Sequence, residues 1–191
     1  MLIGRIRIVH DEYGENPRDN SDYGSVLLAF HGRYNLGDKD APGFNPRDYA
    51  GWSEMRATIE KRANPAVILP VYLYDHGGLS VSTEPFACAW DSGQLGWIYI
   101  PRSNLDTHYG IKRLTVKGRE RLEKSLRAEI DELNTYLTEG CYGFIAEERT
   151  QDGWNEVDTC WGFVGRDHTK NGMVDHFYGW TAKGYEIQEA T

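Results

Sequence analysis

Two stretches near position 80 combine side chains that can transfer protons or attack a substrate. The first, Asp75-His76-Gly77-Gly78, follows an apolar run and sets an imidazole beside a carboxylate. His76 can act as a general acid or base near neutral pH, and Asp75 can orient it. Asp and Gly are also the residues that a tight turn requires, so a turn alone explains the same segment. Both interpretations stay open from the sequence.

The second stretch, residues 85–94 (PFACAWDSGQ), holds a thiol, an indole, a carboxylate and an amide. Cys88 would become a nucleophile if folding brought an imidazole close enough to ionise it. The available imidazoles are His10, His31 and His76. No cysteine-protease signature surrounds Cys88, and cysteine is often buried, so a structural thiol is the alternative. If the protein is an enzyme, we expect its catalytic residues to be His76, Asp75, Asp91 and Cys88.

Acidic and imidazole side chains also follow the first two predicted strands. His10 and Asp11 come after the first strand, and His31 and Asp38 come after the second. If the strand ends meet at one edge of a sheet, these side chains and the Asp75-His76 segment offer nitrogen and oxygen ligands for a hydrolytic metal ion. Loop histidines are usually solvated and the spacing is not diagnostic, so we assign no metal ligand. Dinucleotide, P-loop, zinc-protease and nucleophile-elbow motifs do not occur in the sequence, so we expect no cofactor.

The chain is rich in aromatic side chains, with six Trp and twelve Tyr. Core packing is the ordinary explanation for most of them, but exposed aromatic residues anchor protein interfaces or stack on bases. The loops after the predicted strands are therefore also candidates for a binding site. Its expected ligand-binding residues are His10, His31, Arg33, Tyr34, Trp90 and Gln94.

Apolar spacing and end signals predict two helices. The first covers about 46–62, where Asn45-Pro46 offers an N-cap followed by proline in the first turn. The second covers about 115–139, where apolar residues repeat every three or four positions, and it ends at Gly140. Two ion pairs one turn apart are expected to support the second helix: Glu120 with Lys124, and Glu123 with Arg127.

Period-two alternation and short apolar runs predict the strands. They cover about 2–9, 25–30, 66–74, 79–83, 95–100, a hairpin of 142–149 with 156–163, and one or two strands within 173–188. Pro70 has no amide donor, so its strand needs an edge or a bulge there. The strands between 66 and 100 are joined by short turns, which suggests an antiparallel meander. We expect an α+β fold, a twisted and mainly antiparallel sheet covered by two helices, in a single domain over 1–191.

Composition narrows the class of protein. The chain has 191 residues, 40% of them hydrophobic, which is enough to build a core without disulfides or a structural metal. No stretch of about 18 apolar residues occurs, so no membrane partner is expected. The formal charge of -8 argues against a general nucleic-acid binder, although a local basic patch is compatible with it. The three cysteines are an odd number with no Cys-x-x-Cys pair, which is typical of reduced thiols, and the N-terminal apolar run is too short for a secretory signal. We therefore expect a cytoplasmic protein.

Four motifs extend over the chain: HGRYNLGD (31–38), LPVYLYDHGG (69–78), PFACAWDSGQLGWIY (85–99) and CWGF (160–163). Together they resemble a family of uncharacterised proteins encoded by bacteriophages and related mobile elements. The resemblance implies an accessory protein that acts in the cytoplasm of the infected bacterial host. It implies no catalytic residues.

Two functions follow from these observations. The first is a phage-type binding protein that inhibits a host process such as a defence system, through a host protein surface or by sequestering a small nucleotide-like ligand. The second is a small hydrolase with a His/Asp site assisted by a cysteine or a metal ion. The missing enzyme motifs and the resemblance favour binding. The sequence does not indicate the oligomeric state.

Overall fold

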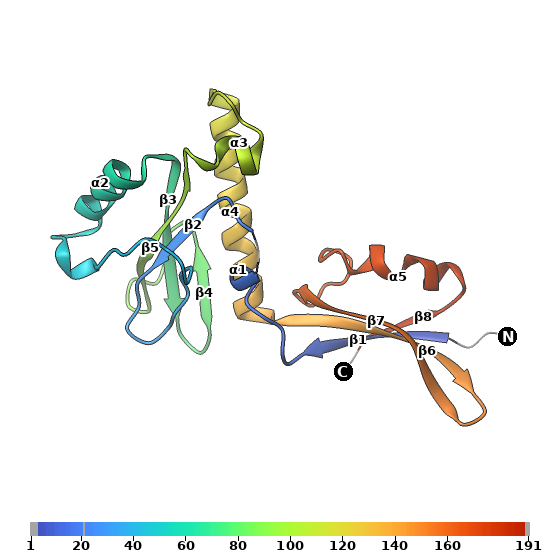
Figure 1. Ribbon diagram of the computed structural model, residues 1–191. Helices are drawn as coiled ribbons and strands as arrows, with labels where there is room; N and C mark the ends of the chain where they lie inside the picture. The colour runs from blue at the N-terminus through green and yellow to red at the C-terminus, as the bar shows by residue number, and fades with distance from the viewer. Residues whose placement is uncertain (1–3, 21, 190–191) are drawn as a thin grey trace. The chain divides into compact units, whose positions relative to one another are not determined.

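The computed structural model describes residues 4–20 and 22–189, which form two four-stranded sheets and the helices around them (Figure 1). Five α-helices, one short 3-10 helix and eight strands lie in this part of the chain. The α+β prediction is therefore confirmed, with two sheets in place of the expected one. The chain divides into two compact units, which we call the terminal unit (1–17 and 135–191) and the central unit (18–134). The single domain stays a prediction.

The central unit holds an antiparallel sheet in the order β2-β5-β3-β4. Helix α2 (Trp52–Ala63) covers one face and packs Met55 and Ile59 against Trp97 and Tyr99. The long helix α4 (Val116–Glu139) runs along the other side of the sheet, and its first 19 residues belong to this unit (Figure 1). The remaining elements are α1 (Pro17–Asn20), β2 (Val26–Ala29), β3 (Pro65–Asp75), β4 (Leu79–Ser82), β5 (Ser92–Pro101) and α3 (Asn104–Tyr109).

The helix expected over 46–62 starts later than its sequence signal. Asn45 does cap a helical turn, since its side chain accepts a hydrogen bond of 3.1 Å from the Arg47 amide, but that turn is a 3-10 helix, η1 (Pro46–Asp48). Tyr49 then returns to an extended conformation, which ends the turn. Helix α2 begins only at Trp52, where the Glu54 carboxylate accepts a hydrogen bond of 2.6 Å from the Ala50 amide.

The expected meander is wrong in its strand order. Strand β4 pairs with β3 alone and forms an edge, while β5 pairs with both β3 and β2. The order differs because the segment between β4 and β5 passes from one side of β3 to the other. Pro70 meets its expected condition: the register shifts between Val71 and Tyr72, and β4 begins its pairing only at Tyr72.

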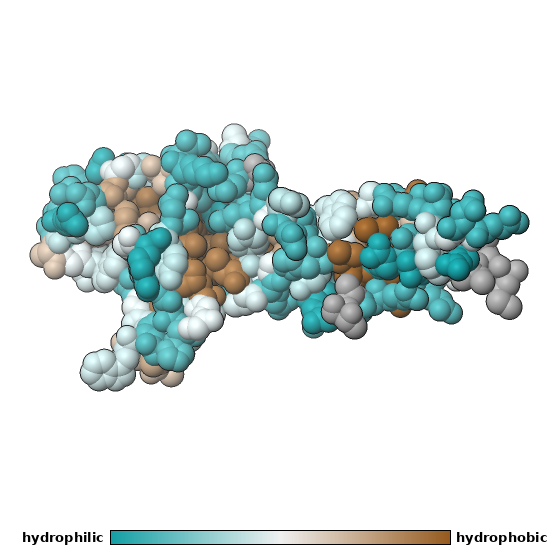
Figure 2. Space-filling view, turned by 90° about the horizontal axis from the view of Figure 1, so that it is seen from below, coloured by the Kyte–Doolittle hydropathy of each residue, from teal (hydrophilic) through white to brown (hydrophobic). Residues whose placement is uncertain are grey.

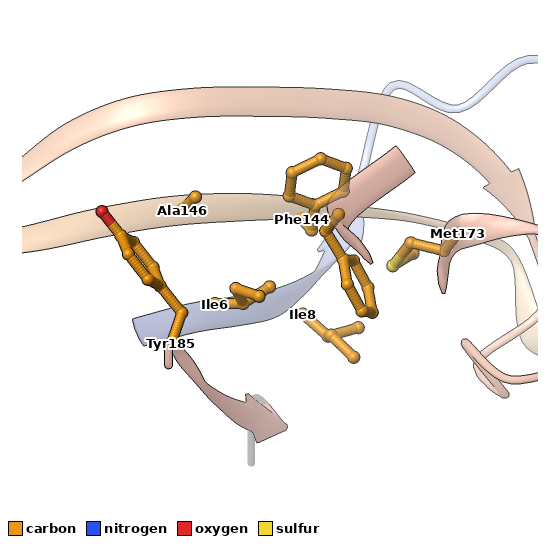
Figure 3. Packing of buried hydrophobic residues seen from close by; sticks show 7 residues of the cluster. Ile6, Ile8, Phe144, Ala146, Met173 and Tyr185 are labelled. Atoms are coloured by element: carbon orange, nitrogen blue, oxygen red, sulfur yellow. The ribbon is translucent and has the colours of Figure 1, made fainter. Parts of the chain in front are cut away.

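The terminal unit holds a sheet in the order β7-β6-β1-β8, in which β1 and β8 run parallel. The predicted hairpin is confirmed as β6 (Cys141–Thr150) with β7 (Gly153–Val164), and the first predicted strand is β1 (Gly4–Asp11). One face of this sheet packs against α5 (Met173–Ala182). Figure 3 shows this core, which consists of Ile6, Ile8, Phe144, Ala146, Met173, Phe177 and Tyr185.

The C-terminal segment 173–188 was expected to form strands, and most of it is helical. Met173, Phe177 and Trp180 are spaced by four and three residues, so α5 places them on the face that packs against the sheet. Their aromatic character resembles a strand, but their spacing is helical. Only β8 (Glu186–Glu189) is extended here.

Three smaller features complete the comparison with the sequence. Of the two ion pairs expected on α4, neither forms within the described residues, and Arg127 instead contacts Glu84 at 2.6 Å. The three cysteines are free thiols. Among the described helices, none has the length and apolar content needed to cross a membrane.

Candidate functional site

Three loops of the central unit meet at one end of its sheet. They follow the ends of β2 and β3 and precede the start of β5. Antiparallel pairing brings these points together, because the end of β3 lies opposite the start of β5 (Tyr74 opposite Ser92). The Asp75 amide continues the ladder with a hydrogen bond of 2.8 Å to the Asp91 carbonyl, and the Phe30 amide donates to the Leu95 carbonyl at 2.9 Å.

These loops enclose an open pocket of about 400 Å³, which we call the loop pocket. Figure 2 shows this end of the central unit in the left part of the view, where hydrophobic residues are surrounded by hydrophilic ones. Phe30, Leu73 and Leu95 supply the hydrophobic part of the lining. Six side chains that the sequence singles out also line the pocket: His31, Arg33, Asp75, Trp90, Asp91 and Gln94.

Arg33 and Asp75 form an ion pair across the pocket, from the end of β2 to the end of β3. The Arg33 side chain is 70% exposed and that of Asp75 is 24% exposed. A pair so accessible to water is worth little in stability, so it fixes the position of the two side chains more than it holds the fold. Asp75 therefore orients Arg33 and does not contact the imidazole of His76 that the sequence places next to it.

The His76 imidazole contacts Asp91 instead of Asp75. The Asp91 Oδ2 atom lies 3.4 Å from the His76 Nδ1 atom and also 3.4 Å from the Cys88 sulfur. A carboxylate beside an imidazole can hold the ring in one orientation. A carboxylate beside a thiol repels the thiolate that a cysteine nucleophile needs. No imidazole contacts Cys88 among the described residues, so this arrangement does not assemble a Cys–His pair.

Aromatic side chains extend the pocket toward a neighbouring hollow of about 580 Å³ that also includes Phe30, His31 and Arg33. The His31 and Tyr34 rings stack with centroids 4.8 Å apart and planes 9° apart. Arg33 lies over the Tyr34 ring at 5.2 Å. Trp90, which also lines the loop pocket, is 97% exposed. The pocket thus presents an indole, a guanidinium and a stacked ring pair to solvent.

His10 is the one predicted site residue that belongs to the terminal unit. It lies near the end of β1, where its ring packs edge-on against Tyr142 at 5.2 Å. Asp11 ends the same strand, and its side chain accepts a hydrogen bond of 3.1 Å from the Tyr13 amide. No three His, Cys, Asp or Glu side chains within the described residues are grouped so that they could share a metal ion. The metal hypothesis therefore has no geometric support.

Sequence reasoning missed a buried charge network in the central unit. The Arg18 side chain is 3% exposed and contacts Asp38 at 2.7 Å and Glu129 at 2.9 Å. Asp38 also accepts the Leu27 amide at 2.8 Å, so this acid is a structural residue. Burial raises the pKa of Glu129, opposed by hydrogen bonds from Ser25 and Arg18. The available signal was Glu129 itself, an acid within the apolar stripe of α4.

Comparisons with known proteins find no relative. A scan against protein-family models matches no family, and searches of curated proteins and of solved structures find no significant match. The phage-protein family therefore stays a prediction from the sequence motifs. Three of those motifs, 31–38, 69–78 and 85–99, supply ten of the residues that line the loop pocket.

Proposed function

We propose that the protein is a binding protein that holds a partner protein at the loop pocket. The observation that carries this proposal is Trp90, which is 97% exposed on the rim of the pocket. An indole is a large and mainly apolar side chain, so full exposure to water is costly and burial against a partner recovers that cost.

The loop that bears Trp90 is held in place before any partner arrives. Two contacts bridge Trp90: the Ser92 hydroxyl donates to the Cys88 carbonyl, and the Cys88 thiol contacts Asp91. The Asp91 carbonyl also accepts a hydrogen bond of 2.8 Å from the Asp75 amide, which ties the loop to β3. A loop with a fixed backbone loses little backbone conformational entropy on binding, which favours affinity.

The other residues of the rim suit a protein surface better than a small ligand. Trp, Tyr and Arg are the side chains most enriched among residues that dominate binding energy in protein interfaces. Trp90, Arg33 and Tyr34 supply one of each within adjoining hollows. A nucleotide-like ligand is usually enclosed by its pocket, whereas this pocket is open and its indole projects into solvent.

The phage resemblance supplies the proposed setting. Since three of the four motifs that carry it also line the loop pocket, we assign the pocket to the accessory role, which is inhibition of a host process in the bacterial cytoplasm. A component of a host defence complex is the first class of partner to test.

The test begins with the photocrosslinker p-benzoylphenylalanine in place of Trp90, in cells that express the host proteins. A crosslinked partner is then purified and titrated calorimetrically. Trp90→Ala should lower the affinity by about 30-fold, the loss typical of a dominant interface residue. Tyr178→Ala is the matched control, because Tyr178 is a 68% exposed aromatic residue of the terminal unit. Equal affinity of the Trp90→Ala variant would reject the proposal, and a nucleotide that binds in a Gln94-dependent manner would replace the protein partner.

A hydrolase is the second candidate, because the 3.4 Å contact of Asp91 with His76 resembles the carboxylate–imidazole half of an acid–base site. Among the described residues, no serine hydroxyl and no cysteine thiol is hydrogen-bonded to His76. The geometry therefore supports proton transfer to or from a bound water or substrate more than a covalent mechanism.

A further inference from the structure

The segment 102–121, at the end of the central sheet opposite the loop pocket, has an excess of basic residues, although the chain as a whole carries a charge of -8. Between positions 102 and 121 the sequence has six basic residues and only two acidic ones, Asp106 and Glu120. We call these six residues the basic end: Arg102, Lys112, Arg113, Lys117, Arg119 and Arg121. The average charge of the chain hides this local excess.

The fold brings the basic end together at one place. The Arg102 amide donates to the Asn64 carbonyl at 3.3 Å, and the Arg119 guanidinium donates to the Ala66 carbonyl at 2.9 Å. Both acceptors flank the start of β3, so both arginines lie where that strand begins. Figure 1 shows α3 and the start of α4 at this same end of the sheet. Strand β3 then runs away from this end to Asp75 in the loop pocket.

Most charges of the basic end are uncompensated. Lys112, Arg113, Lys117 and Arg121 are all exposed, and none has an ion pair or a side-chain hydrogen bond among the described residues. Elsewhere in the same unit, ion pairs hold four arginines: Arg18, Arg33, Arg56 and Arg127. Glu120 is the only acid within this stretch of α4, and it does not pair with Lys124. The positive end of the α4 dipole adds to the same field.

We propose that the basic end docks on the phosphate backbone of double-stranded nucleic acid. Exposed Lys and Arg side chains that lack internal partners neutralise phosphates and release counterions, which drives this kind of binding. No fully exposed aromatic residue lies between 102 and 121, and burial raises the pKa of Tyr109, the one tyrosine there, to about 12. The basic end therefore lacks the stacking surface that single strands need, and it contacts backbone without reading base sequence.

This surface is independent of the loop pocket. It uses other elements, other side chains and another ligand chemistry, so a variant of one surface leaves the other intact. The acidic remainder of the chain repels a polyanion, so only the basic end approaches the duplex, and binding is weak and salt-dependent.

The test is fluorescence anisotropy of the full chain with a labelled 20-base-pair DNA duplex, an RNA duplex of equal length and single-stranded DNA. We expect micromolar binding to a duplex at 50 mM salt, falling about 100-fold at 200 mM salt if four phosphates are contacted. The variant Lys117→Glu with Arg121→Glu should lose at least about tenfold, because two contacts become repulsive. Circular dichroism checks that this variant folds.

A control variant with the same change of net charge separates local from global charge. Arg166→Glu with Lys183→Glu alters two exposed basic residues of the terminal unit and should bind as the wild type does. Trp90→Ala should also bind as the wild type does. Absence of duplex binding at 50 mM salt, an equal loss in both double variants, or equally tight binding of a labelled polyglutamate peptide would each overturn the proposal. Preferred binding of single-stranded DNA would overturn the assignment to duplexes.

Discussion

The Oδ2 atom of Asp91 lies 3.4 Å from the Nδ1 atom of His76, although 15 positions separate the two residues in the chain. The contact exists because β3 and β5 are antiparallel neighbours, which sets the loop after β3 against the loop before β5. The same Asp91 oxygen contacts the Cys88 thiol, so one carboxylate links the two chemically active side chains of the loop pocket. The contact of Asp91 with His76 supports an acid–base site, whereas its contact with Cys88 disfavours a cysteine nucleophile.

Because we propose binding and not hydrolysis at the loop pocket, and because the Asp91 carboxylate disfavours a thiolate at Cys88, the purified protein should show no turnover of chromogenic ester and phosphoester substrates. Continuous absorbance assays at pH 5 to 9 measure this. Hydrolysis that disappears in both His76→Ala and Asp91→Ala, with unchanged circular dichroism, would instead establish a hydrolase. General acid–base catalysis typically accounts for about 100-fold or more in rate, which is easily resolved.

Replacing Arg18 with Met should destabilise the protein by about 3 to 5 kcal/mol, because Glu129 and Asp38 are then left facing each other without their cation. Urea unfolding followed by circular dichroism measures the change. The double variant Arg18→Met with Glu129→Leu removes a charge from each side and should recover most of the loss. A single variant as stable as the wild type would show that water, and not Arg18, compensates these acids.

Two buried tyrosines should differ in how the protein's stability responds to removal of the hydroxyl. The Tyr99 hydroxyl is buried and has no hydrogen-bond partner among the described residues, so Tyr99→Phe should be neutral or stabilising. The Tyr185 hydroxyl donates to Glu148, so Tyr185→Phe should cost about 1 kcal/mol. Thermal unfolding of the two variants side by side provides the comparison, and equal shifts in both would contradict it.

The acid sensitivity of the protein should depend in part on Asp167. Hydrogen bonds from Lys170 and Thr169 lower the pKa of Asp167 from 3.8 to about 2. A carboxyl with a lowered pKa in the folded state adds stability above its unfolded value and loses it as the pH falls through the folded value. The contribution is therefore present above about pH 4 and lost between pH 4 and 2. The urea midpoint of Asp167→Asn should fall less than that of the wild type over this range.

The control for this prediction is Lys170→Met, which removes the largest cause of the shift. This variant should resemble Asp167→Asn in its response to acid. If the urea midpoints of both variants change with pH as the wild-type midpoint does, the exposed Asp167–Lys170 contact does not contribute to stability in solution. Many surface ion pairs contribute nothing measurable.

The sequence was sufficient for the parts of the fold that follow from strong periodicity. The apolar repeat of α4 and the alternation of the β6–β7 hairpin both predict the observed elements. Helix α5 was missed because Phe177 and Trp180 suit strands as well as helices, and only their spacing distinguishes the two. The order of β3, β4 and β5 could not be derived, because turn length does not determine which side of β3 a returning strand takes.

The candidate site was predictable at the level of its loops but not of its contacts. Chain position places Asp75 beside His76, yet Asp75 pairs with Arg33 and His76 pairs with Asp91. Which carboxylate meets which cation depends on strand register, which no local pattern encodes. The basic end was missed for another reason: the chain's overall charge of -8 conceals the local excess of basic residues between positions 102 and 121, and only the fold shows that they lie at one end of the sheet.

Strand β3 connects the basic end to the loop pocket. Its eleven residues extend on the order of 35 Å from the neighbourhood of Arg119 to that of Arg33. A macromolecule seated at one extremity leaves the other accessible, so the central unit can act as a rigid spacer that keeps a captured protein at a fixed separation from a duplex. Simultaneous occupancy would then raise the effective concentration of each guest near the other without any contact between them.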